Sequence, residues 1–212
     1  MDNKKNTIIK DTVILLIITL ISGFILAAVN KVTAEPIAYA KKEEKDKAYR
    51  AMFTTADAFE ENEKLIEKCE SSAEFLDSKG YSGVKVDEVL VSKSSNETLG
   101  YILNSTSSNG YGGDIQISLG IDKEGKIQGF EILSISETVG LGMKADEDEF
   151  KSQFIGKNVE LIEYTKAGAT EENQIDALSG ATITTSAVTE AVNSALLYAQ
   201  EYILGQGAVI NE

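Results

Sequence analysis

The chain lacks residue types on which much enzyme chemistry depends. Its 212 residues include no histidine and a single cysteine, Cys69. The missing histidine excludes Ser-His-Asp and Cys-His catalysis, histidine-ligated zinc or haem, and an imidazole proton shuttle. One cysteine forms no intrachain disulfide and holds no iron-sulfur cluster by itself, so we interpret Cys69 as a small buried hydrophobic residue. We therefore expect no metal site and no catalytic residue of these kinds.

Basic residues are also in short supply. Lysine and arginine number 20 against 34 aspartate and glutamate residues, which gives a formal net charge of −14. Such a surface repels a phosphate backbone, so nucleic acid is not an expected partner. Hydrophobic residues make up 42% of the chain and charged residues 25%, which is typical of a globular protein and excludes general disorder. The length suggests one domain with appendages.

One long stretch, Thr12 to Val29, has eighteen residues and no charge. A helix of about 20 residues crosses the hydrocarbon layer of a membrane, and lysines at both ends of the stretch can extend to the membrane surface. A cleaved signal peptide is the alternative, because Lys4, Lys5 and Lys10 form a basic start and residues 32–34 have the spacing of a cleavage site. The stretch is longer than the usual apolar region of a signal peptide, which favours a retained anchor within residues 1–30.

The anchor predicts a single-pass protein of the cytoplasmic membrane. A short tail with three lysines before the span is typical of a cytoplasmic N-terminus, although basic residues after the span weaken this asymmetry. The rest of the chain is then expected on the extracytoplasmic side. Residues 31–55 are predicted to form a stalk helix with Pro36 in its first turn, and residues 56–212 to form the domain.

The pattern changes to that of strands from residue 84 onward, and we predict strands at 84–91, 99–105, 115–121 and 127–135. The third is the clearest, because isoleucine and leucine alternate with small or polar residues along it. Turn residues at 122–125 should join it to the fourth strand as an antiparallel hairpin. Helices are predicted at 145–155 and 186–203. The predicted fold class is α+β, an antiparallel sheet with helices packed on one covered face, preceded by one N-terminal transmembrane helix.

Hydroxyl groups gather before the last predicted helix, in residues 176–186, D-A-L-S-G-A-T-I-T-T-S. The first turn of a helix has unpaired N–H groups and the positive end of its dipole, which favour a phosphate. Glycine at 180 allows close approach of the backbone to a ligand, and the serine and threonines offer hydroxyl donors. The pattern therefore predicts an anion site. The alternative is that one hydroxyl caps the helix and the others are incidental.

Residues 176–184, D-A-L-S-G-A-T-I-T, resemble the flavinylation motif Asp-x-x-Ser/Thr-Gly-Ala-Thr-x-Thr of the FMN-binding domain family. Every fixed position matches. In that family the last threonine carries FMN through a phosphodiester bond, so the resemblance implies covalent FMN on Thr184. It also implies a set of cofactor neighbours around this residue: Asp176, Ser179, Gly180, Ala181, Thr182 and Thr185.

Two further stretches resemble the same family. Residues 137–142, E-T-V-G-L-G, are similar to its Glu-Thr-Pro-Gly-Leu-Gly segment, with Val139 in place of proline, which loosens the turn. Residues 110–113, G-Y-G-G, are similar to another of its loops, where Tyr111 either stacks near the flavin ring or simply packs. The resemblance implies a cofactor wall made by Glu137, Thr138, Gly140, Leu141, Gly142 and Lys144.

The order of one span, a short stalk and a flavinylated domain resembles the G subunit of Rnf-type complexes, which link ferredoxin and NAD. The C subunit of the sodium-pumping NADH:quinone reductase shares the motif within a longer chain. The resemblance implies a covalent-FMN electron carrier in an ion-translocating oxidoreductase (translocase) complex, with no substrate turnover of its own. The implied partners are the other membrane and redox subunits, and a flavin transferase that attaches the FMN.

Two other functions stay open from the residues alone. One is an exported, membrane-tethered domain that binds a phosphate-containing ligand reversibly at the same hydroxyl-rich helix start. The other is a standalone extracellular flavoprotein that carries electrons to an outside acceptor. Flavin that survives denaturation separates covalent attachment from reversible binding.

Overall fold

The computed structural model describes residues 2–205, with side chains from residue 8 onward. Lys4 and Lys5 of the predicted basic tail therefore have no described side chains, and the last seven residues of the predicted domain lie outside the described part. The chain separates into two compact units, Met1–Lys45 and Asp46–Glu212.

A single helix, α1 (Asp2–Met52), contains the whole uncharged stretch. From Ile8 it is long and apolar enough to cross a membrane, and the side chains of the uncharged stretch are exposed. Pro36 lies inside this helix, so the prediction that it lies in a first turn is wrong. Proline removes one backbone donor, and here the turns on both sides remain helical.

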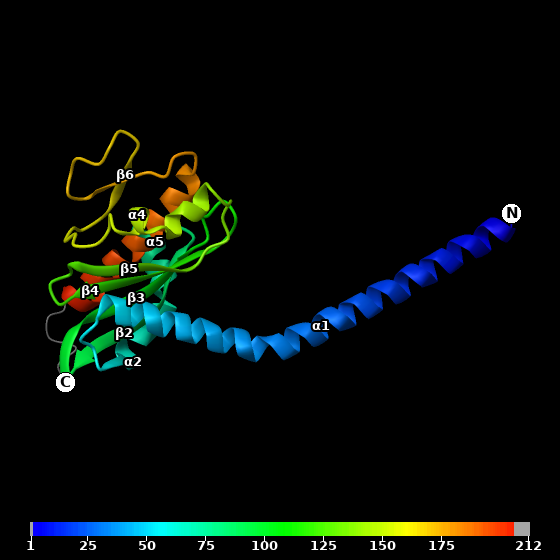
Figure 1. Ribbon diagram of the computed structural model, residues 1–212, viewed down its shortest axis with the longest axis horizontal. Helices are drawn as coiled ribbons and strands as arrows, with labels where there is room; N and C mark the ends of the chain where they lie inside the picture. The colour runs from blue at the N-terminus through cyan, green and yellow to red at the C-terminus, as the bar shows by residue number, and fades with distance from the viewer. Residues whose placement is uncertain (1, 206–212) are drawn as a thin grey trace. The chain divides into compact units, whose positions relative to one another are not determined.

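The second unit is built on a five-stranded antiparallel sheet in the order β1-β2-β3-β4-β5 (Figure 1). The strands are β1 (Ala58–Glu61), β2 (Val84–Ser94), β3 (Glu97–Ser107), β4 (Ile115–Asp122) and β5 (Ile127–Ser134). The predicted α+β class, the four predicted strands and the β4–β5 hairpin are confirmed. Positive φ angles at Ser95 and Asn96 close the tight turn between β2 and β3.

Two short strands, β6 (Glu163–Thr165) and β7 (Gln174–Asp176), form a separate parallel pair. The sequence did not predict these strands or β1. Each has only three or four residues, too few for a period-2 pattern to stand out.

The helices of the second unit pack on the sheet. They are α2 (Glu63–Glu70), α3 (Ser72–Ser78), α4 (Asp148–Lys151) and α5 (Thr182–Ala199), with a 3-10 turn η1 (Gly142–Asp146) and a π turn η2 (Gln200–Leu204). Helix α5 packs against β2, β3 and β4 and covers one face of the sheet (Figure 1). Its start at Thr182 is four residues earlier than predicted. The predicted helix 145–155 is wrong, because Glu147 is extended and divides this region into η1 and α4.

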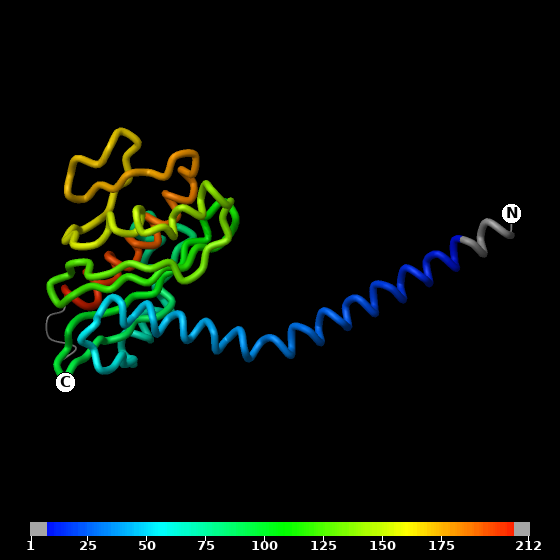
Figure 2. The backbone as a smooth tube through the Cα atoms, viewed as in Figure 1, coloured from blue at the N-terminus to red at the C-terminus, as the bar shows by residue number. Residues whose placement is uncertain are grey.

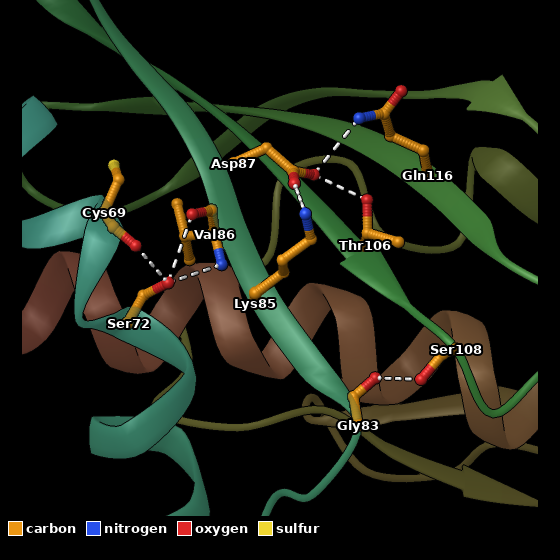
Figure 3. A network of polar contacts seen from close by, with 9 residues as sticks. All are labelled: Cys69, Ser72, Gly83, Lys85, Val86, Asp87, Thr106, Ser108 and Gln116. Carbon is orange, nitrogen blue, oxygen red and sulfur yellow. Dashed lines mark hydrogen bonds and ion pairs between the residues drawn. The ribbon is translucent and has the colours of Figure 1, made fainter.

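Polar contacts hold α2 and α3 against the edge of the sheet (Figure 3). The Ser72 hydroxyl bonds the backbone of Cys69 at 2.7 Å and accepts the Val86 N–H at 3.1 Å. The Asp87 carboxylate pairs with Lys85 at 2.8 Å. Cys69 is half-buried and packs against the main core, and burial raises the pKa of its thiol.

The other face of the sheet is covered as well, which corrects the prediction of one covered face. Glycines occupy neighbouring positions on β3, β4 and β5, and the side chains of Met52 and Phe53 lie against them. A Cβ on Gly100 would lie 2.8 Å from the Phe53 ring, and one on Gly120 would lie 3.1 Å from Met52 Sδ. A Cβ on Gly129 would collide with Met52. Because the three glycines have no side chains, Met52 and Phe53 can pack directly on the backbone of the sheet.

A buried polar cluster joins the last turns of α1 to the same face. The Asn104 side chain on β3 donates to Tyr49 Oη at 2.5 Å and to Glu88 Oε2 at 2.6 Å. Tyr49 is only 3% exposed, and burial raises the pKa of its hydroxyl. Residues 46–52 of α1 are thus an integral part of the second unit.

Candidate functional site

Three segments far apart in the sequence meet around a pocket of about 630 Å³. In Figure 2 the orange start of α5 lies beside the yellow-green segment near residue 140. Pockets for small molecules and cofactors commonly measure roughly 300–1,000 Å³, so the volume suits a cofactor. The pocket is lined by Tyr111, Glu137, Thr138, Leu141, Gly142, Gly180, Ala181, Thr182, Ile183 and Thr184.

The start of α5 has no side-chain cap. Its N-cap residue is Ala181, which has no side-chain hydrogen-bonding group. Within the described residues, the N–H groups of Thr182, Ile183 and Thr184 have no acceptor, whereas the next one, of Thr185, bonds Ala181 O at 3.0 Å. The alternative prediction, that a side-chain hydroxyl caps this helix, is therefore wrong. Three unpaired N–H groups beside the pocket suit an anionic group.

Two adjacent threonines of the motif have opposite surroundings. The Thr185 hydroxyl accepts the Leu178 N–H at 3.1 Å and donates to Ala181 O at 2.9 Å, so both of its capacities are used within the fold. Thr184 is 2% exposed and lines the pocket, and its hydroxyl has no hydrogen-bond partner among residues 8–205. A nearly buried hydroxyl without a partner is uncommon in folded proteins. Thr184 is thus the more buried of two motif threonines, with Thr182, that line the pocket and have no side-chain hydrogen bond within the described residues.

Gly142 lies directly against both Thr184 and Glu137. A Cβ placed on Gly142 would be 2.6 Å from Thr184 Oγ1, 2.7 Å from Glu137 Cβ and 2.9 Å from Glu137 Oε2. Only glycine leaves this point empty. The other carboxylate oxygen of Glu137 accepts the N–H of Gly112 at 3.2 Å, which ties the 110–113 loop to the same wall.

The outer wall of the pocket is apolar. Tyr111 is 72% exposed, and Leu141 and Ile183 also have exposed side chains. Gly180 has a positive φ of 74°, which brings the motif turn against Leu141. An apolar rim above a polar floor suits a ligand with a planar ring at one end and an anionic group at the other.

Several predicted residues lie elsewhere. Asp176, Ser179 and Lys144 line a separate, smaller pocket of about 210 Å³. Asp176 Oδ1 accepts the Ala169 N–H at 2.6 Å, and this bond orders the loop between β6 and β7. Gly140 forms a turn with a positive φ of 78° and does not line the larger pocket.

Two residues of the site were not singled out from the sequence, Ile183 and Gly112. Ile183 occupies a variable position of the motif, one residue before Thr184, and it was missed because the helix was predicted to begin only at residue 186. Gly112 was quoted only as part of a glycine-rich loop. Gly112 lets its loop pack against residues 136 and 137: a Cβ there would collide with the Ser136 carbonyl, and the Gly112 N–H bonds Glu137.

Comparison with known proteins agrees with this arrangement. The FMN-binding domain family matches residues 110–197, which include all three segments of the pocket. The G subunit of the proton-translocating ferredoxin:NAD(+) oxidoreductase complex of Clostridium ljungdahlii is 31% identical over 195 residues, covering 92% of this chain and 93% of that protein. The G subunit of the Na(+)-translocating complex of Acetobacterium woodii is 39% identical over 111 residues, covering 51% of this chain and 53% of that protein.

Among solved structures, the C subunit of the Na(+)-translocating NADH-quinone reductase from Parabacteroides distasonis is similar, with a TM-score of 0.46 and 24% identity. That similarity covers 52% of this chain and 59% of the other. The Clostridium relative covers far more of this chain, so that similarity includes most of α1 as well as the second unit.

Proposed function

The chain belongs to the family of G subunits of ion-translocating oxidoreductase complexes, and we propose that it is the FMN-carrying electron-transfer subunit of such an Rnf-type complex. Its relatives are named as subunits of ferredoxin:NAD(+) oxidoreductases that translocate protons or Na(+). A flavin supplies one-electron chemistry without histidine or cysteine from the protein. This agrees with a chain that has no histidine and one half-buried cysteine.

The observation that carries the proposal is the Thr184 hydroxyl, which is nearly buried, lines the pocket and has no partner among the described residues. We propose that its oxygen is joined to the FMN phosphate as a phosphodiester. The unpaired N–H groups of Thr182 and Ile183 would bond the phosphate oxygens, and the helix dipole would favour their charge.

The rest of the pocket would position the ring. Tyr111, Leu141 and Ile183 offer apolar surface for a planar ring system, and Thr138 offers a hydroxyl to its polar atoms. Gly142 and Gly180 let the backbone come close. A covalent bond would keep the cofactor in place on a side of the membrane where free FMN is scarce.

The N-terminal helix supports a membrane location. Its apolar stretch is long enough to span a bilayer, and no side chain of that stretch is buried in the protein. We propose that α1 is a retained anchor with a cytoplasmic N-terminus, which places the FMN domain outside the cytoplasm next to the other subunits. External protease should then digest the domain in wall-free cells, whereas digestion only after lysis would contradict this orientation.

Intact mass and in-gel fluorescence test the covalent bond. The full-length chain made together with a flavin transferase should gain the mass of FMN less one water and fluoresce after denaturing electrophoresis. Thr184→Val should lose both signals completely, and Thr184→Ser should keep them because it retains a hydroxyl. Thr189→Val is the matched control, since Thr189 lies on α5 and its hydroxyl bonds only the helix backbone at Thr185. Fluorescence that persists in Thr184→Val after denaturation would contradict attachment of FMN to Thr184.

A further inference from the structure

Glu137 is an acidic side chain in the wall of a pocket that we propose receives a phosphate. It is 9% exposed, and its Oε2 and the Thr184 hydroxyl both approach the position of the Cβ that Gly142 lacks. A carboxylate so close to a phosphate weakens anion binding through like-charge repulsion. Binding alone therefore gives no reason for an acidic residue here, and a chemical role explains it better.

The two carboxylate oxygens of Glu137 have different surroundings. Oε1 accepts the Gly112 N–H at 3.2 Å, which fixes the orientation of the carboxylate. Oε2 and the Thr184 hydroxyl oxygen both lie within 3 Å of one point, the position of the Cβ that Gly142 lacks. Rotation of either side chain toward the other brings the two oxygens into hydrogen-bond contact.

We infer that Glu137 accepts the proton of the Thr184 hydroxyl when the flavin phosphate is attached to it. The inference rests on the proposed function. A threonine hydroxyl is a weak nucleophile that needs a neighbouring base, and this chain has no histidine to act as one. A carboxylate takes the same role toward a substrate hydroxyl in protein kinases.

The step balances with a flavin dinucleotide as the donor. The bond from Thr184 Oγ to phosphorus forms while the phosphoanhydride P–O bond breaks, and the leaving nucleoside monophosphate takes the electron pair. The hydroxyl proton goes to Glu137 Oε2 and from there to solvent. Nothing is oxidised or reduced. FMN itself is the poorer donor, because the same displacement on its phosphate would have to expel hydroxide.

The test compares rates of attachment on the full-length chain in detergent, produced without flavin and then mixed with flavin adenine dinucleotide and a flavin transferase. Glu137→Gln keeps the size of the side chain and an acceptor for Gly112 but removes the base. We expect it to slow covalent attachment on the order of 10²-fold at saturating dinucleotide, the scale of a lost general base. Glu190→Gln is the matched control, because Glu190 lies on α5 outside the pocket and bonds Asn109 and Ser186.

Two further measurements separate proton transfer from folding and binding. Glu137→Asp keeps a carboxylate one carbon shorter, so its rate should lie between those of wild type and Glu137→Gln. Reversible binding of free FMN, measured by fluorescence quenching, should be unchanged or tighter in Glu137→Gln because one negative charge is gone. Slower attachment together with retained FMN binding supports the inference.

Three results would overturn it. The first is attachment at the wild-type rate in Glu137→Gln, and the second is a slow rate that saturating dinucleotide restores, which marks a binding role. The third is an equal rate in Glu137→Asp and Glu137→Gln. If Thr184→Val loses covalent flavin while Glu137→Gln behaves as wild type, only this inference fails. If Thr184→Val keeps it, the proposed function fails as well.

Discussion

Glycines allow close packing of side chains in two regions of the second unit, and the two regions differ in which side chains come close. On the sheet face near residue 52, three glycines make room that the side chains of Met52 and Phe53 fill. At the pocket, Gly142 lets the side chains of Thr184 and Glu137 come just as close, with atoms 2.6–2.9 Å from the absent Cβ. The missing Cβ brings apolar side chains onto the sheet in the first region, and brings a hydroxyl and a carboxylate together at the wall of a pocket in the second.

The polar groups of the two regions differ in the same way. Near the end of α1, Tyr49, Asn104 and Glu88 bond one another in a buried cluster, in which only Oδ1 of Asn104 has no partner within the described residues. At the pocket, the Thr184 hydroxyl is nearly as buried and has no partner in the described part of the chain. The bonds of the first region stabilise the domain, whereas the Thr184 hydroxyl lines the pocket and is available for chemistry.

The filled region should be the more sensitive to an added side chain. Gly129→Val would force atoms against Met52, whose backbone Cα is 3.2 Å from the new Cβ position. We expect a loss of about 3 kcal/mol in the free energy of unfolding, the upper end of the usual cost of overpacking. Chemical unfolding of the full-length chain in detergent, followed by circular dichroism, measures it.

Met52→Ala provides the control for that change. The double variant should lose less free energy of unfolding than the two single variants lose together, because the smaller side chain at residue 52 relieves the collision. Full additivity would show that Gly129 does not act through Met52.

An added side chain at the pocket should cost function as well as some stability, because a Cβ on Gly142 would be 2.6 Å from Thr184 Oγ1 and 2.7 Å from Glu137 Cβ. Gly142→Val would force Thr184 and Glu137 apart, so we expect at least a tenfold slower covalent attachment, equivalent to about 1.4 kcal/mol or more. Far-ultraviolet circular dichroism should stay unchanged, and any flavin that is attached should show a shifted visible spectrum.

Val139→Ala is the control in the same loop, because Val139 is 87% exposed and does not line the pocket. A fully flavinylated Gly142→Val chain with wild-type rate and spectrum would show that the loop has only a structural role.

The buried tyrosine cluster predicts the smallest effect, a loss of stability in alkali. Burial raises the pKa of Tyr49 above the value of about 10 that it has when unfolded. The neutral hydroxyl therefore stabilises the fold fully below about pH 10, and this contribution falls as the pH rises further. Tyr198 is shifted in the same direction, again mainly by burial.

Tyr49→Phe isolates the contribution of one tyrosine. It should cost about 1 kcal/mol near neutral pH through the lost hydrogen bond, and should make the alkaline fall less steep. Unfolding free energies at about pH 8 and pH 11 give the comparison. An equally steep fall in the variant would mean that Tyr49 does not contribute to it.

Much of the sheet could be predicted because strands carry their pattern locally. Ile115, Ile117, Leu119 and Ile121 alternate with smaller residues, and all four are buried against the main core. The region at 145–155 shows the limit of this reasoning. Its acidic first turn favours a helix, but the 3-10 turn that begins at Gly142 leaves Glu147 extended, and the helix is cut to one turn.

The sequence by itself determined the uncharged N-terminal stretch, the alternating strands and the motif that ends at Thr184, because each is a pattern among residues close together in the chain. Only the tertiary structure decided that Thr185 is bonded within the fold while Thr184 is not, and that Glu137 lies beside Thr184. It also decided that Met52 covers the second face of the sheet. The contacts of Glu137 and Met52 join segments tens of residues apart, and those of Thr185 depend on how the motif turn folds, so no local periodicity encodes them.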